Sequence, residues 1–162
     1  MIKKILLFLL AALVVIQFFH PKPNKSKGEQ QYFIGKNFAI PDDVNHLLKV
    51  TCFDCHSNNT RYPWYANIQP IDWWLTRHIK EGKKGLNFDE YTNKRLRYQY
   101  HKMEEVIEQV KEGEMPLNSY TWTHKDAKLS QEERNKLTDW ANSVMDSLKA
   151  RYPIDSLVRK KN

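Results

Sequence analysis

The five residues Cys52-Phe53-Asp54-Cys55-His56 constrain this chain more than any other feature. They contain its only two cysteines, which are separated by two positions and followed directly by a histidine. Two thiols at this spacing can act as a redox dithiol, supply half of a zinc site, or form two thioether bonds to a haem. The adjacent histidine favours haem, because it places an axial iron ligand next to the attachment points.

Other sequence features disfavour the two alternatives. A structural zinc site usually needs four protein ligands, and no second cysteine pair exists, although His78, His101 and His124 could be recruited. A dithiol oxidoreductase of the thioredoxin type needs strands alternating with helices. From Pro41 onwards apolar residues recur at helical spacing, and no stretch alternates for long enough to form a strand. The sequence therefore predicts an all-α fold.

Four helices are expected after Pro41. The first begins at Pro41-Asp42-Asp43 and runs into Cys52, and the second follows Pro70 and stops at Gly82 and Gly85. The third is predicted to open at Asn87 as N-cap and to end at Gly113, and the fourth to begin at the capping box Ser130 to Glu133. Residues 114–129 between the last two have no periodicity and are predicted to form an ordered loop.

The N-terminus suggests export. Fifteen residues from Ile5 to Phe19 contain only one polar side chain, Gln17, and no small-residue cleavage site follows them. We therefore predict a membrane-anchor helix at 1–19, a flexible tether at 20–40, a folded domain at 41–150 and a short basic tail at 151–162. This organisation predicts a single-pass protein on the periplasmic side of the inner membrane, or a periplasmic or secreted one if the segment is cleaved. The formal net charge of +7 is spread along the chain, which argues against a nucleic-acid partner.

Several separated motifs resemble one known group. The segment from Cys52 to Phe88, EMPLNSY at 114–120, His124, LSQEE at 129–133 and Trp140 is similar to the bacterial haem-binding domain family, which is related to small class I cytochromes c. The resemblance implies a small cytochrome c-like helical domain wrapped around one haem. It also implies covalent haem c on Cys52 and Cys55, with His56 as the proximal ligand of the iron.

Met115 is the candidate for the second axial ligand. It lies in the loop after Gly113, and Pro116 restricts the backbone beside it. A methionine between the middle helices and the C-terminal helix plays this role in class I cytochromes c. His78 and His124 are the competing candidates. Trp64, Trp74 and His78 are expected around the haem, since a flat apolar cofactor needs aromatic walls.

Two functions follow from these expectations. With both axial positions filled, the protein would be a one-electron carrier rather than an enzyme, and its partners would be redox proteins such as respiratory complexes. The alternative is a haem-based sensor or peroxidase-like module in which the sixth position is open or its ligand displaceable.

Overall fold

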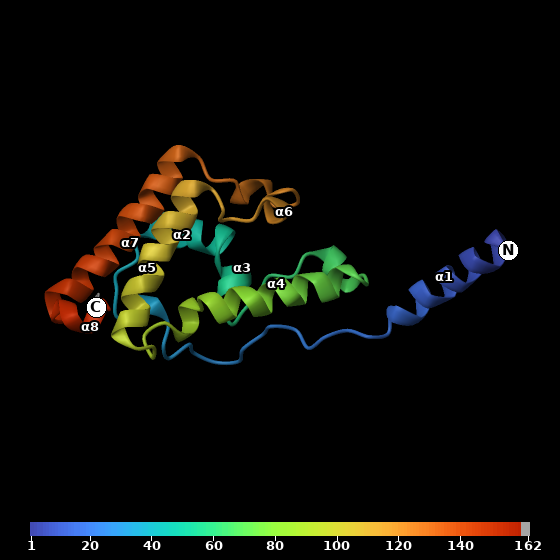
Figure 1. Cartoon of the computed structure of the whole chain (residues 1–162), viewed down its shortest axis with the longest axis horizontal. Coiled ribbons are helices and arrows are strands. Elements are labelled where there is room, and N and C mark those ends of the chain that lie inside the picture. The colour runs from blue at the N-terminus through green and yellow to red at the C-terminus, as the bar shows by residue number, and fades with distance from the viewer. Residues whose placement is uncertain (160–162) are drawn as a thin grey trace.

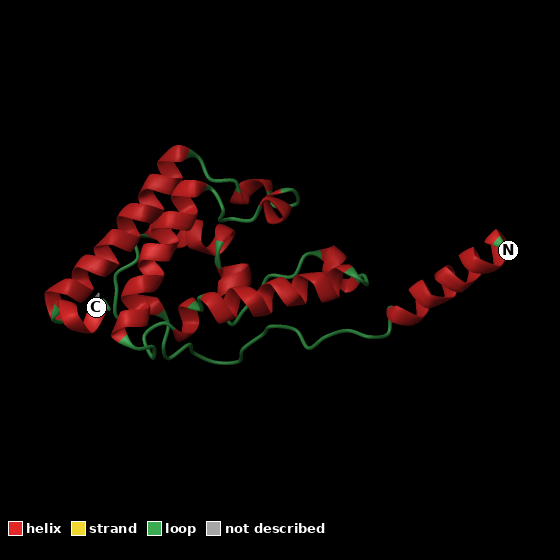
Figure 2. Ribbon diagram, viewed as in Figure 1, coloured by secondary structure: helices red, strands yellow, loops and turns green. Residues whose placement is uncertain are grey.

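The computed structural model describes residues 1–159, and all of its named elements are helical. The all-α prediction is therefore confirmed for this part of the chain, as Figure 2 shows. Two long helices, α5 (Leu96–Glu112) and α7 (Gln131–Arg151), pack side by side. Helix α2 (Asp42–Thr51) contacts α7, and α4 (Ile71–Gly85) extends away from this group in Figure 1.

The core lies between α2, α5 and α7. Helix α7 buries Leu137, Ala141, Val144 and Leu148, which recur every three or four residues and so share one face. The predicted capping box at its start is confirmed, because Ser130 Oγ accepts from the Glu133 N–H and the Ser130 N–H donates to Glu133 Oε2. Met103 of α5 is fully buried in the same core.

One helix boundary and one loop differ from the predictions. Asn87 caps a short 3₁₀ helix, η3 (Phe88–Glu90), and α5 begins only at Leu96. Helix α4 continues through Gly82 and ends at Gly85. Helix α5 ends as expected at Gly113, whose φ of 78° is left-handed. The expected loop at 114–129 contains one turn of helix, α6 (Asn118–Thr121), and a 3₁₀ turn, η4 (Lys125–Ala127).

The N-terminal helix α1 (Ile2–Ile16) lies apart from the other helices in Figure 1 and buries none of its residues. Within residues 1–159, no helix has both the length and the apolar character needed to cross a membrane. The predicted membrane anchor at 1–19, and with it the localisation on the periplasmic side of the inner membrane, is therefore wrong. The helix that forms at this apolar stretch, α1, has only 15 residues and includes Lys3 and Lys4.

The segment expected to be a tether, 20–40, packs against the domain. Its 3₁₀ turn η1 (Ile34–Lys36) places Ile34 in the core, fully buried, and Phe38 follows it there. Upstream, the Asn24 side chain donates to the Ser57 carbonyl at 2.9 Å and accepts from Lys83 Nζ at 2.6 Å.

The expected basic tail, 151–162, is also partly structured. It contains the short helix α8 (Ile154–Leu157), whose Leu157 is buried in the core. Residues 160–162 of the predicted tail lie outside the described residues.

Candidate haem site

The two cysteines lie on one turn that follows α2. Cys52 ends α2, and the short helix α3 (Phe53–His56) begins at once, with the Cys55 and His56 N–H groups donating to the Cys52 carbonyl. Both cysteines are free thiols and partly buried. Burial raises the pKa of each thiol to about 11. Both thiols are therefore protonated near neutral pH.

The imidazole of His56 is oriented by the end of α4. Its Nδ1 lies 2.9 Å from the carbonyl oxygen of Leu86. A carbonyl can only accept, so Nδ1 carries the proton and Nε2 keeps its lone pair. Burial lowers the pKa of His56, and the backbone carbonyls of Leu86 and Gly82 offset this only in part. The ring is thus neutral with one nitrogen available, which is the form that binds a metal ion.

Helix α4 approaches α3 closely because Gly82 has no side chain. A Cβ atom at Gly82 would lie 2.8 Å from the Cys55 carbonyl oxygen and 3.2 Å from the Cys55 Cβ. Contacts this short do not occur between real side chains and backbone, so the approach requires glycine. The helix ends at Gly85, one of the two glycines predicted to stop it, whereas Gly82 lies inside α4 and permits the close contact with the second cysteine.

A family model described as "Haem-binding domain" matches residues 11–143, which is most of the chain. The chain belongs to the haem-binding domain family. No curated protein and no solved structure matched this chain. The matched range includes α3 with its cysteines, all of α4 and the loop that contains Met115.

The residues at α3 fit a haem. Two free thiols and an imidazole whose Nδ1 is held by a backbone carbonyl lie on one turn, and these are the groups that would attach a haem and bind its iron. Large aromatic side chains are also exposed in this haem-binding domain: Trp64 is 77%, Trp122 73% and Trp74 45% exposed. Exposed tryptophan surface of this size is available to cover an apolar cofactor.

The other predicted site residues lie on separate segments. Trp74 and His78 contact each other on α4, with ring centroids 4.3 Å apart, and His78 Nδ1 donates to the Trp74 carbonyl at 2.9 Å. Trp64 begins the 3₁₀ helix η2 (Trp64–Asn67). Met115 is partly buried after α5, where its N–H donates to the Gln109 carbonyl at 3.1 Å.

A buried polar network beside the cysteines was missed by the sequence analysis. Asp54, between the two cysteines, is 6% exposed and accepts hydrogen bonds from Arg61 and Tyr120. Tyr120 is 66 residues away in sequence. The one available signal was the position of Asp54 between the two cysteines, and nothing in the pattern identified its partners.

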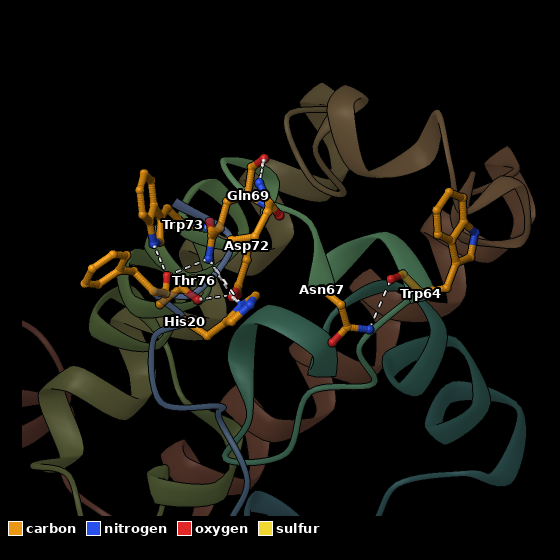
Figure 3. Close-up of polar contacts among 9 residues, drawn as sticks. His20, Trp64, Asn67, Gln69, Asp72, Trp73 and Thr76 are labelled. Atoms are coloured by element: carbon orange, nitrogen blue, oxygen red, sulfur yellow. Dashed lines mark hydrogen bonds and ion pairs between the residues drawn. The ribbon is translucent and has the colours of Figure 1, made fainter. Parts of the chain in front are cut away.

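A second network at the start of α4 also went unpredicted (Figure 3). His20 Nδ1 lies 2.8 Å from Asp72 Oδ2, and Gln69 Nε2 donates to the same carboxylate oxygen. Trp73 Nε1 donates to the Phe19 carbonyl at 2.9 Å. Trp64 lies apart from this group in Figure 3. These contacts connect residues 19 and 20 to α4, and so fix where the N-terminal segment meets the haem-binding domain.

Proposed function

We propose that this haem-binding domain is a c-type, class I cytochrome-like protein that transfers single electrons. One haem would be joined to Cys52 and Cys55 by thioethers, with its iron held by Nε2 of His56. When bound, such a group supplies a one-electron iron couple. The observation that carries the proposal is the 2.9 Å hydrogen bond from His56 Nδ1 to the Leu86 carbonyl, beside two free thiols.

The protein residues have distinct tasks in this proposal. The partly buried thiols stay protonated near neutral pH, and each would add its S–H across one vinyl group of the haem, with sulfur joined to one vinyl carbon and the hydrogen to the other. The Leu86 carbonyl holds the imidazole in one tautomer and one orientation. Gly82 keeps α4 against the carbonyl of Cys55 and so fixes the second attachment point.

Met115 is the proposed sixth ligand, and Trp64, Trp74 and His78 are the proposed surroundings. The choice of an electron carrier over a sensor or peroxidase-like module is supported by the loop of Met115. In this loop, Tyr120 is hydrogen-bonded to Asp54, which lies between the two cysteines. Thr123 is hydrogen-bonded to Tyr65 of η2. A ligand held by such a loop leaves no open position for a substrate. The partner would then be another redox protein.

The test is a pair of matched substitutions in haem-loaded protein, Met115→Leu and Met145→Leu. Both keep side-chain volume and remove a thioether, but Met145 is buried in α7. We expect Met115→Leu to lose the low-spin ferric spectrum and to bind carbon monoxide readily when reduced, and Met145→Leu to behave as wild type. An unchanged Met115→Leu spectrum would assign the sixth position to His78 or His124. Ready carbon monoxide binding by the wild type would instead support the sensor or peroxidase-like function.

A further inference from the structure

Asp54 is the centre of a hydrogen-bonded cluster directly beside the cysteines. Its Oδ1 accepts from the Arg61 N–H at 2.9 Å and from Arg61 Nε at 3.2 Å. Its Oδ2 accepts from Arg61 Nη2 at 3.3 Å and from the hydroxyl of Tyr120 at 2.8 Å. The same hydroxyl lies 3.1 Å from the Val50 carbonyl of α2, so only the Asp54→Asn variant tests the Asp54 contact by itself. A carboxylate buried to this degree needs such donors, and a hydrogen bond to a charged group is stronger than one between neutral groups.

Tyr120 brings the Met115 loop to this cluster. It lies in α6, and its ring stacks on His124 with centroids 4.1 Å apart and planes 11° apart. The His124 N–H donates to the Tyr120 carbonyl, which makes the end of α6 a compact unit. Burial and the nearby Asp54 charge raise the pKa of Tyr120, so its hydroxyl remains a donor at neutral pH.

Two further contacts limit the movement of the loop. Tyr65 of η2 donates to Thr123 Oγ1 at 2.7 Å, but this bond is exposed to solvent and therefore weaker. On the other side of Met115, its own N–H is bonded to the Gln109 carbonyl of α5. Met115 thus lies between an attachment to α5 and the partly buried Tyr120–Asp54 contact with α3.

We propose that Tyr120 is a positioning residue that, through Asp54, holds the Met115 loop on the haem-attachment helix and so limits release of the sixth iron ligand. The inference rests on the proposed function for the role of Met115. The attachment of the loop to α3 stands on the hydrogen bonds alone.

The test compares Tyr120→Phe with Tyr98→Phe in the full-length protein as purified. Each change removes one hydroxyl that donates a 2.8 Å hydrogen bond, but Tyr98 bonds to the Gly85 carbonyl at an exposed site. Two quantities are measured: the rate at which added imidazole replaces the sixth ligand of ferric protein, and amide hydrogen exchange at Thr121, Trp122 and His124.

Tyr120→Phe is expected to raise both rates about 10- to 100-fold, the size expected for a lost hydrogen bond to a buried charge. Tyr98→Phe should leave both unchanged. Asp54→Asn, whose amide oxygen is a weaker acceptor, should raise both rates by a smaller factor. This variant replaces Tyr120→Phe in the comparison if Tyr120→Phe does not fold.

Failure of this proposal is distinguishable from failure of the proposed function. If the purified protein carries no covalent haem, the proposed function fails, and amide exchange still shows whether Tyr120 holds the loop. If haem is attached and imidazole replaces the ligand at the same rate in wild type and in Tyr120→Phe, the positioning role is overturned. Faster imidazole exchange in Tyr120→Phe, without the same change in Tyr98→Phe, supports it.

Discussion

At the residue scale, the state of His56 decides whether the site can bind iron. The ring is partly buried and its Nδ1 proton is donated to the Leu86 carbonyl. The pKa of the imidazole is lowered mainly by burial, with the charge of Lys102 adding to the effect. The motif predicted His56 as the ligand, because this histidine directly follows the second cysteine. The partner that selects its tautomer, 30 residues away at the end of α4, has no sequence signature.

This burial predicts a pH dependence of stability in haem-free protein. The folded-state pKa of His56 is below the unfolded value, so under acid conditions the unfolded state binds more protons. Stability should therefore fall as pH decreases below about 6.5, by at most about 1.4 kcal/mol per pH unit.

Urea denaturation at about pH 7.5 and about pH 5.5 measures this dependence. The variant His56→Gln should lose most of it, whereas His46→Gln, which removes an exposed histidine of α2, should keep it. An unchanged slope in His56→Gln would show that the ring is not buried in its neutral form.

At the scale of the elements, the contact between α3 and α4 carries the site. Periodicity predicted α2, α4 and α7 correctly, since their apolar faces are local in sequence. It misplaced the start of α5 because asparagine followed by acidic residues signals any helical N-terminus, including the short η3. It also missed α8, which is too short to show a period.

Substitution of Gly82 tests this packing. A Cβ atom there would meet the Cys55 backbone, and such overpacking costs about 1–3 kcal/mol, against about 1 kcal/mol gained from better helix propensity. Gly82→Ala should therefore lower the melting temperature and the yield of attached haem.

The matched control is Gly85→Ala. A Cβ atom at Gly85 has nothing within 4 Å, so this variant should equal or slightly exceed the wild type in stability. Equal melting temperatures for both variants would mean that α3 and α4 are not in close contact.

At the scale of the whole molecule, the domain includes part of the segment expected to be a tether. Its high content of proline, lysine and asparagine predicted a flexible linker, but Ile34 and Phe38 are buried in the core. The carbonyl of Ala39 also accepts from Trp140 Nε1 at 3.2 Å. Composition describes the average of a segment, and two apolar side chains are enough to dock it.

Ile34→Ala tests this docking. Removing a fully buried isoleucine side chain should lower the free energy of unfolding by about 2–5 kcal/mol. Ile5→Ala, at a position of α1 that is 57% exposed, should change it by less than about 0.5 kcal/mol. Urea denaturation of the two variants makes the comparison, and a negligible effect at Ile34 would restore the flexible tether.

The central claim is covalent haem on Cys52 and Cys55, and the intact mass of the denatured protein tests it most directly. The full-length chain is produced in a host with haem-attachment machinery, beside a variant carrying Cys52→Ala and Cys55→Ala. We predict that the wild type retains the added mass of one haem after acid-acetone extraction and that the variant has the mass of the polypeptide alone. A wild-type protein that loses all its haem in this extraction would contradict the account.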